Sequence, residues 1–384
     1  MQTVRIFCVK LKPIQKVLSH MTKTAKKIFY FYLTPRKKLL HDFKSGIEPS
    51  TFLYGLPQLQ QLGFEVNFSD LAYHPLNLLR PLLQPLEQLH MRLLAYPLGF
   101  RLHQALILYP LYKNADILFC TQDSAGLPIA WLKRIGLIKN KVIIVSSNLT
   151  NAIEQTKSKW MKNFIKKNLN SIELLICSSK KEQEILSHFL GRPVEFLADG
   201  IDTKYFMPAQ KTKPSIDILS VGRDPYRDYQ TLFAAVRNKP WRVTVVCTPD
   251  LLNNLRVPDN VTILTDRSMQ ELRQLFTQAK LIVLPMKKTN KPQGHSVLLT
   301  AMAMGKKIIA SNVVGITSAY NLIEFSSIAL VTPQNSKRLA NAISIMLSNN
   351  QSLSNLSRLR SKISVKQYAS KLHGLLKKYE FCLI

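Results

Sequence analysis

Runs of four to six apolar residues, often β-branched or aromatic, recur along the whole chain. Such runs predict buried strands, and the segments between them have the spacing of amphipathic helices. In the first half, strands are predicted at residues 28–33, 64–69, 116–120, 142–146, 174–178 and 194–197. In the second half, they are predicted at 216–221, 242–247, 261–264, 281–284, 307–310 and 328–331. The alternation of strand and helix predicts parallel βαβ units with helices on both faces of the sheets.

Two such sets of strands predict two similar α/β domains of the Rossmann-like kind. The 384 residues suffice for two domains of ordinary size. The division falls near residues 200–212, where Gly, Pro and Lys are dense. We therefore expect a basic N-terminal extension, two domains and a C-terminal segment, spanning residues 1–27, 28–205, 206–365 and 366–384.

Two segments depart from the regular pattern. Residues 71–113 are rich in Leu and Pro, which predicts broken helices inserted into the first domain. Residues 157–169 form a basic amphipathic helix, with Trp160 and Phe164 on its apolar face. Such a helix either lies on a membrane or packs its apolar face on the neighbouring sheet.

Composition places the chain among folded proteins of the cytoplasm. Hydrophobic residues make up 46% of it, and the five cysteines lack the spacing of a metal site. Reduced, buried thiols are the expectation. No apolar stretch approaches the roughly 18 residues that span a bilayer. Lysines and a proline interrupt residues 1–20, so that stretch lacks the apolar centre of a signal peptide.

The net charge is +30, from 53 Lys and Arg against 23 Asp and Glu. Such a field attracts polyanions or an anionic membrane surface. Residues 1–41 hold ten Lys and Arg with no acid, and the last thirty residues hold seven with one acid. The alternative is a set of solvated lysine faces without a partner. No zinc-finger spacing or RNP-like phrase supports specific nucleic-acid binding.

Residues 291–312, KPQGHSVLLTAMAMGKKIIASN, follow the predicted strand at 281–284 and form a polar elbow before a helix. In open α/β sheets, ligands bind beyond the carboxyl ends of the strands. We expect the helix to begin near Ser296, with its hydroxyl capping the first turn. Gly294 lets a ligand approach the backbone closely. Helix-end amides and the helix dipole would then face an anion such as a phosphate.

Three phrases in order carry a resemblance: ADGIDTKYFMP (198–208), SVGRDPYRDYQTL (220–232) and the elbow with its AMAMGKKIIAS. Together they resemble the family 4-type glycosyltransferases of the GT-B fold. In that family the first phrase links two Rossmann-like domains, the second holds the donor diphosphate, and the elbow holds the donor sugar and its phosphates. FLYGLPQLQQLGFEV (52–66) is similar to the family's first helix and second strand, so the resemblance covers most of the chain.

The resemblance implies a donor site in the second domain. Arg223, after Gly222, stands where the family's Arg meets the donor diphosphate. Arg227 falls near the family's Lys, one residue early. Fixed cations stabilise the charge that builds up on a leaving nucleoside diphosphate. The alternative is that both arginines are surface loop residues. The elbow residues that would cradle the diphosphate are Gly294, His295, Ser296 and Val297.

The elbow departs from the family pattern, which carries two glutamates eight positions apart. Here the second falls on Thr300 and the first on or near Pro292–Gln293. The turn at 294–296 resembles a variant branch with a polar turn in place of the glutamate. Its backbone amides and side chains would hold the β-phosphate, but no glutamate is left to contact sugar hydroxyls. Alternatively, His295 is a solvent-facing loop residue.

The acceptor side is predicted at the rim of the first domain. Asp123 follows the strand at 116–120 and is the candidate base or electrostatic partner of an oxocarbenium-like centre. It could equally cap the following helix. Thr121 and Asn148 lie on the same rim, Asn148 as a partner for a sugar hydroxyl. Gly46 in the first βα loop is a candidate to admit the phosphate.

The resemblance implies transfer of a hexosyl group from a nucleotide-sugar to a glycan or lipid-linked acceptor, with retention. No cofactor or metal is expected, because cations and a helix dipole would neutralise the diphosphate. In the GT-B fold the C-terminal helix, here within 366–384, crosses back to the N-terminal domain. Both basic ends would then lie on the acceptor-side domain, which suits a peripheral membrane protein. The alternative is a catalytically inactive nucleotide-sugar-binding scaffold.

Overall fold

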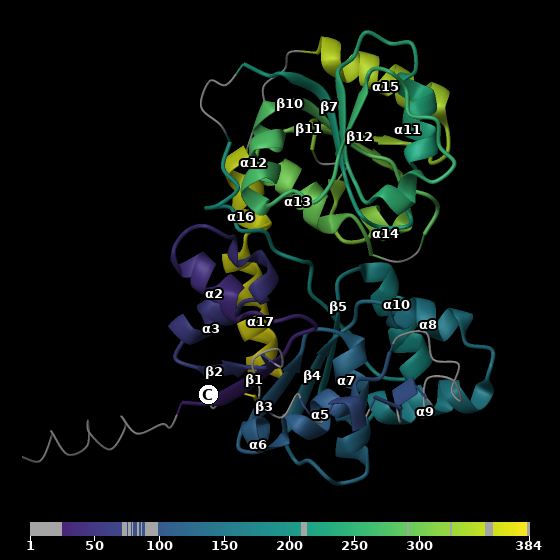
Figure 1. The fold of residues 1–384 in the computed structure, drawn as a ribbon. Coiled ribbons are helices and arrows are strands. Elements are labelled where there is room, and N and C mark those ends of the chain that lie inside the picture. The colour runs from purple at the N-terminus through teal and green to yellow at the C-terminus, as the bar shows by residue number, and fades with distance from the viewer. Residues whose placement is uncertain are drawn as a thin grey trace, which may run out of the picture.

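A computed structural model describes residues 25–70, scattered positions between 75 and 88, and residues 99–208, 213–289, 292–322, 325–349 and 356–381. Two domains, one after the other in the chain, each contain a six-stranded parallel sheet with helices on both faces (Figure 1). This is the two-domain α/β architecture predicted from the sequence.

The N-terminal sheet has the order β2-β1-β3-β4-β5-β6. Its strands are β1 (Lys27–Phe31), β2 (Glu65–Phe68), β3 (Ile117–Cys120), β4 (Lys141–Val145), β5 (Leu174–Cys177) and β6 (Glu195–Phe196). The helical elements between them are α2 (Lys37–Lys44), η1 (Ser50–Leu53), α3 (Leu56–Gln61), α5 (Leu102–Ile107), α6 (Tyr109–Tyr112), α7 (Asp123–Arg134), α8 (Leu149–Gln155), α9 (Lys159–Leu169) and α10 (Lys180–Leu190).

The C-terminal sheet has the order β12-β11-β10-β7-β8-β9. Its strands are β7 (Ile216–Val221), β8 (Val243–Val246), β9 (Val261–Leu264), β10 (Ala279–Leu284), β11 (Lys307–Ser311) and β12 (Ile328–Val331). Its helical elements are α11 (Tyr229–Val236), η4 (Pro249–Leu252), α12 (Met269–Gln278), α13 (His295–Ala303), α14 (Val314–Thr317), α15 (Ser336–Ser348) and α16 (Leu356–Lys362). The last helix, α17 (Val365–Lys378), follows.

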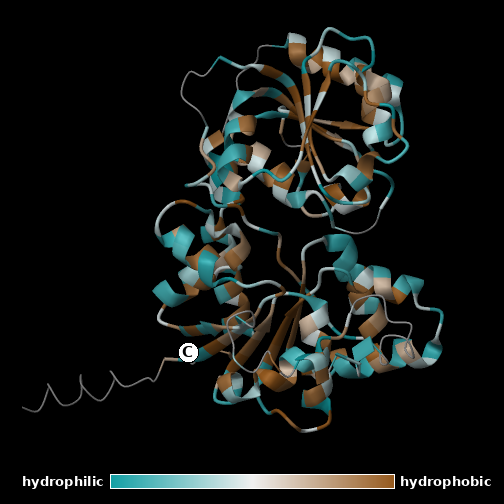
Figure 2. Cartoon of the chain, viewed as in Figure 1, coloured by the Kyte–Doolittle hydropathy of each residue, from teal (hydrophilic) through white to brown (hydrophobic). Residues whose placement is uncertain are grey.

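Each predicted strand is confirmed to within about two residues at its ends. The reason is visible in Figure 2, where the strands of both sheets are largely brown and lie between two layers of helices. A parallel sheet covered on both faces needs continuous apolar runs, and those runs are the strongest pattern in the sequence. Cys120, Cys177 and Cys247 are free and buried in or beside strands.

The two irregular segments differ in outcome. The end of the Leu- and Pro-rich segment forms α5 and α6, whereas most of residues 71–98 lies outside the described residues. Helix α9 buries Met161, Ile165 and Leu169 in the N-terminal core but leaves Trp160 62% exposed. The main apolar face of this helix therefore packs inside the domain. None of the helices in the described part of the chain is long and apolar enough to cross a membrane.

The chain crosses between the domains twice at one place. Ile201 of the linker forms a parallel bridge with Ser364, just before α17. A Cβ on Gly200 would lie 2.8 Å from the Cβ of Tyr368, so only glycine lets the two crossing segments pass this closely. Asp202 accepts hydrogen bonds from the backbone amide and hydroxyl of Ser50, at 2.9 and 2.7 Å. The linker phrase thus holds the two domains together.

The C-terminal helix returns to the N-terminal domain, as the resemblance implied. Tyr368, Leu372 and Leu376 of α17 join the core cluster that contains Ile28 and Tyr30 of β1. Helix α16 packs instead on α13 in the C-terminal domain. The predicted boundaries at residues 205 and 365 fall in the linker before β7 and at the start of α17.

Candidate functional site

The carboxyl edges of the two sheets face each other. The amide of Lys180, just after β5, donates to the carbonyl of Ser318, just after α14. In the C-terminal sheet the strand order reverses between β7 and β10, which are neighbours although two strands separate them in sequence. A crevice at such a switch point is where open α/β sheets bind ligands.

The loops after β7 and β10 are joined at this switch point. Asp228 donates its amide to the carbonyl of Pro285 at 3.0 Å, and Lys287 donates to that of Tyr226 at 2.8 Å. Arg227 and Met286 form an isolated antiparallel bridge between these pairs. The Gly-Arg phrase and the start of the elbow, some sixty residues apart, therefore form one structural unit.

Arg227 is the most unusual side chain of this unit. It is 4% exposed, and among the described residues no carboxylate forms an ion pair with it. Its Nη1 lies 3.3 Å from the sulfur of Met286, and its Nε is buried without a hydrogen-bond partner. Burial lowers the pKa of the guanidinium from its ordinary value. Burying a cation without an ion-pair partner costs several kcal/mol, so Arg227 is a candidate to bind an anion.

Gly222 makes room for that guanidinium. A Cβ at this position would lie 2.0 Å from Nε of Arg227, which no side chain can tolerate. The backbone of Gly222 is held on both sides, because its amide donates to Val246 and its carbonyl accepts from the hydroxyl of Tyr229 at 2.8 Å. Glycine here is therefore a requirement of the arginine's position.

The elbow brings a helix end to the same place. Helix α13 begins at His295 after Gly294, whose φ of 73° is left-handed and favours glycine. Both terminal nitrogens of Arg227 lie 3.6 Å from where a Cβ of Gly294 would stand. The N-terminus of α13, with its free amides, thus lies beside the buried guanidinium.

The predicted cap is wrong. Ser296 is inside the first turn, Gly294 occupies the N-cap position, and no side chain caps the helix. The left-handed turn at Gly294 starts the helix one residue early, and the amides of its first turn are left without a capping side chain. Ser296 is exposed, and Val297 packs against the C-terminal core.

His295 is a buried contact between the elbow and the linker. It is 5% exposed, so it is not a solvent-facing loop residue. Its Nε2 lies 2.8 Å from the carbonyl of Gly315, and its Nδ1 lies 3.2 Å from Oδ2 of Asp199. Tyr320 donates its hydroxyl to the carbonyl of Asp199 at 2.8 Å. Both ring nitrogens therefore face protein atoms, and the imidazole fixes the elbow to the linker.

The remaining donor-side positions behave differently. Arg223 is exposed and lies four residues before Arg227 in the same loop. Thr300, in place of the second glutamate, is 7% exposed and donates its hydroxyl to the carbonyl of Ser296. Gln293 is buried, with Oε1 unpartnered. Neither position offers a carboxylate.

On the acceptor side, Asp123 is 1% exposed at the first position of α7. Its Oδ2 accepts from the amides of Ser147 and Asn148, at 2.9 and 2.7 Å, and from the hydroxyl of Ser147 at 2.9 Å. Burial raises its pKa, and these hydrogen bonds oppose the rise. Asp123 thus holds the loop after β4. Its catalytic role stays a prediction.

A second buried carboxylate, not noticed in the sequence, holds the same loop. Glu182 of α10 is 1% exposed, and its Oε1 accepts from Ser146 at 2.7 Å and Thr150 at 3.3 Å. Burial raises its pKa to about 7, with a smaller contribution from the charge of Asp123. The sequence signal was Ser179-Lys-Lys-Glu182, a helix-start pattern in which Ser179 does cap α10.

Three further predicted residues have local structural roles. Thr121 is buried and donates its hydroxyl to the carbonyl of Phe31 at 2.9 Å. Gly46 has a φ of 74° in the turn that ends α2, with open space where a Cβ would stand. Asn148 is partly exposed at the start of α8. Their ligand-binding roles stay predictions. No cluster of three potential metal ligands occurs among the described residues.

Comparisons with known proteins concern the family and the fold. The model of the family "Glycosyl transferases group 1" matches residues 217–349, which is the C-terminal domain. No curated protein sequence matches the chain.

Three solved structures illustrate the likeness of fold. Sucrose-phosphate synthase from Thermosynechococcus elongatus has a TM-score of 0.67 and 17% identity, covering 92% of this chain and 98% of that one. Anabaena HepE, solved with UDP and glucose, has a TM-score of 0.59 and 16% identity, covering 92% and 100%. A glycosyltransferase from Rickettsia africae has a TM-score of 0.60 and 13% identity, covering 93% and 99%. The GT-B fold that the resemblance implied is confirmed, and the C-terminal domain matches the group 1 glycosyltransferases.

Proposed function

We propose that the protein transfers a hexosyl group from a nucleotide-sugar to a glycan or lipid-linked acceptor. The observation that carries this proposal is the buried, unpaired guanidinium of Arg227 at the switch point of the C-terminal sheet. It lies beside the free N-terminus of α13, and both features favour a bound diphosphate. The titles of two neighbours are in keeping with it, one naming UDP and glucose and another naming a UDP-forming synthase with glucose 6-phosphate.

The proposed chemistry follows from charge. When the bond between the sugar and the diphosphate breaks, the leaving group gains negative charge. Arg227 and the amides at the start of α13 would stabilise that charge without moving, because Gly222 and the paired loops fix their positions. Arg223 would add an exposed cation. No metal is required in this scheme, and retention of configuration is proposed from the resemblance alone.

The nature of the acceptor is proposed from the basic surface. A net charge of +30 suits a polyanionic glycan or a lipid-linked acceptor in an anionic membrane. We propose a peripheral protein of the cytoplasm, with the N-terminal domain toward the acceptor. Asp123 and Asn148 are the proposed cleft residues on that side.

The test is a donor panel. Wild type and Arg227→Met are incubated with UDP-, GDP- and ADP-hexoses, with and without glycan or lipid-linked acceptors, and released nucleoside diphosphate is measured. One donor should be consumed by the wild type only, faster with acceptor, and the anomeric proton coupling in the product reports retention. If Arg227→Met turns over as fast as wild type, the donor-site assignment fails.

A second function has a specific observation in its favour. Thr300 stands in place of a family glutamate and makes a hydrogen bond within its own helix, so no carboxylate reaches toward a donor sugar from this position. A nucleotide-sugar-binding scaffold would keep Arg227 and lose turnover. Binding of a nucleotide without consumption of any donor, over the whole panel, would favour that function.

A further inference from the structure

The edge of the N-terminal domain that points away from the C-terminal domain carries a broad depression of about 510 Å³. It lies at the amino ends of β1, β3 and β4 and is bordered by α6 and by the turn between α7 and β4. We call it the basal surface and define it by Lys26, Tyr109, Lys113, Leu137, Lys139 and Lys141, all of which line the depression.

Large apolar side chains are exposed at its rim. Leu137 is 60% exposed and Tyr109 is 42% exposed, and both line the depression. Next to them along the chain, Ile135 is 46% and Leu111 is 50% exposed. These apolar side chains lie on helix α6 and on the turn after α7, with charged residues around them. An exposed apolar patch rimmed by polar residues is typical of an interaction site.

The charge around them is predominantly positive. Lys113 and Lys139 are exposed, and among the described residues neither has a hydrogen-bond or ion-pair partner. Lys26 is paired with Asp116 at 3.4 Å, and Lys141 donates to the carbonyl of Glu380 at 2.8 Å. Four lysines and two acidic residues therefore line the depression, which leaves two lysines free to bind an anion.

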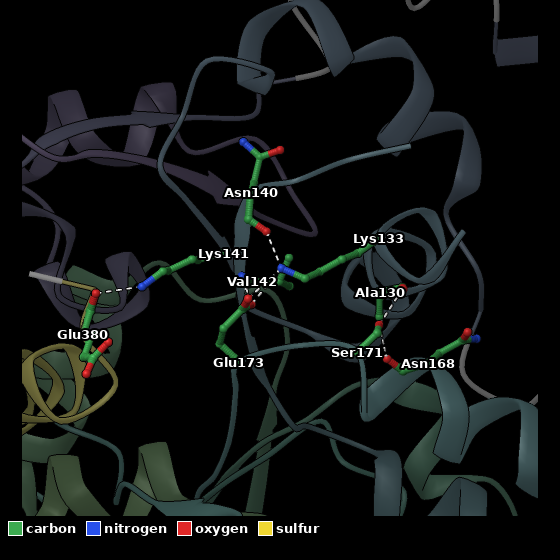
Figure 3. Close-up of polar contacts among 9 residues, drawn as sticks. All are labelled: Ala130, Lys133, Asn140, Lys141, Val142, Asn168, Ser171, Glu173 and Glu380. Carbon is green, nitrogen blue, oxygen red and sulfur yellow. Dashed lines mark hydrogen bonds and ion pairs between the residues drawn. The ribbon is translucent and has the colours of Figure 1, made fainter. Parts of the chain in front are cut away.

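Polar contacts join the turn after α7 to the end of α6, and Figure 3 shows those of Lys133 with Asn140 and Glu173. The side-chain amide of Asn140 donates to the carbonyls of Tyr112 and Ala115, at 3.3 and 2.5 Å. The backbone carbonyl of Asn140 accepts a hydrogen bond from Lys133 Nζ at 2.6 Å, and Lys133 also pairs with Glu173 at 2.7 Å. The turn after α7 is thus tied to the end of α6, so the backbone that carries the exposed side chains is already ordered before binding.

We propose that the basal surface docks on an anionic lipid bilayer, with Leu137 and Tyr109 at the acyl boundary and Lys113 and Lys139 on lipid phosphates. Residues 1–24, which join β1 beside Lys26, carry five basic residues and no acidic one, so the charge continues along the chain. A second copy of this chain, also at +30, would be repelled. A nucleic acid would leave the apolar rim without a partner.

This inference deepens the peripheral membrane association in the proposed function. The basal surface is at the opposite edge of the sheet from the interdomain site, so a docked protein turns that site away from the bilayer, which favours the glycan among the two acceptors proposed above. Vesicle binding and nucleotide binding can therefore be measured separately, and each can fail without the other.

The test is flotation of the full chain with phosphatidylcholine vesicles, with and without about 30% phosphatidylglycerol. Wild type should float only with the anionic vesicles. Lys113→Gln/Lys139→Gln should weaken the partition about thirtyfold, at about fivefold per lysine. Ile135→Ser/Leu137→Ser should weaken it at least about tenfold, because apolar area then stays in water.

The matched controls lie on the C-terminal domain, where Lys239→Gln/Lys337→Gln removes two exposed lysines and Ile345→Ser removes a side chain that is 58% exposed. They should float like wild type. The fluorescence of the tryptophan introduced by Leu137→Trp should be quenched by brominated lipid, measured against the parent protein. The fluorescence of the tryptophan introduced by Ile345→Trp should not be quenched. Failure of wild type to float, or equal weakening by the control set, overturns the proposal. So does a basal variant that floats normally but loses a dimer, which would assign the surface to a second copy.

Discussion

The carboxyl edges of the two sheets face each other, and each buries charged side chains of the opposite sign. They differ in how far the protein itself supplies partners for those charges. On the C-terminal edge, Arg227 is a buried cation that forms no ion pair with any described residue, although the charge of Asp224 acts on it. On the N-terminal edge, Asp123 and Glu182 are buried carboxylates, and each has one oxygen that accepts hydrogen bonds from the loop after β4 and one buried oxygen without a partner. Burying a charge is costly on either edge, but the N-terminal carboxylates accept several hydrogen bonds within the protein that offset part of this cost.

The difference separates binding from scaffolding. A group that accepts several hydrogen bonds within the protein, as Asp123 does, contributes to the fold, and its removal should cost stability. A group whose interactions are incomplete contributes to a ligand, and its removal should cost affinity while stability is kept or gained. The two edges therefore predict opposite responses to substitution.

The largest effect is expected for Arg227→Met. Loss of a fixed cation at the diphosphate should reduce nucleotide affinity and donor turnover by about 100- to 1,000-fold. The melting temperature without ligand should stay level or rise, because an unpaired buried charge is replaced by an apolar side chain. Calorimetric titration and thermal unfolding of the same sample check both. A fall of many degrees in the unliganded protein would show that Arg227 is structural.

Asp123→Ala should do the reverse. Two backbone amides and one hydroxyl lose their acceptor in a buried site, which should lower the free energy of unfolding by about 3 kcal/mol. Nucleotide affinity, measured well below the melting temperature, should stay near the wild-type value. Stability unchanged in urea titration, with loss of turnover alone, would instead give Asp123 the predicted catalytic role.

Glu182 should make stability depend on pH. Its folded pKa of about 7 lies above its unfolded value, so the folded state holds a proton that the unfolded state releases. The stabilisation is complete below the unfolded pKa and is lost as pH rises through about 7. The loss should be on the order of 2 kcal/mol between pH 4.5 and 8, and Glu182→Gln should abolish it. A wild-type stability that rises over this range through the same residue would contradict the account.

Arg223→Gln is the smallest change. The side chain is exposed, so its contribution to a bound diphosphate is screened by water and salt. We expect a three- to fivefold loss of nucleotide affinity, about 1 kcal/mol or less, that shrinks further at high salt. Titrations at two salt concentrations measure it. A loss as large as that of Arg227→Met would remove the distinction between the two arginines.

Much of the fold was predictable because its determinants are local in sequence. Apolar runs marked the strands, and Gly294 marked the break between β10 and α13. The linker phrase was recognisable because Gly200 and Asp202 each meet a structural demand that few residues satisfy.

The site was less predictable because its determinants are contacts between distant segments. Arg223 and Arg227 share one loop, and only the packing of that loop against Met286 buries one and exposes the other. In the sequence Glu182 indicates only the start of a helix. Its hydrogen-bond donor Ser146 is 36 residues away, so this contact could not be predicted. The resemblance placed His295 at the ligand. In the structure its ring contacts Asp199 at the linker and Gly315 in α14, and both residues are distant from it in sequence.

The most direct measurement is nucleotide binding to the C-terminal edge. Thermal unfolding is followed for wild type and Arg227→Met with UDP, GDP, ADP and their common sugar conjugates. A ligand at 100 times its dissociation constant should stabilise the wild type by about 2.7 kcal/mol. The account predicts that one nucleotide series does so and that Arg227→Met, itself as stable as wild type, loses the effect. Stabilisation of both proteins to the same extent, or of neither at millimolar concentrations, would contradict it.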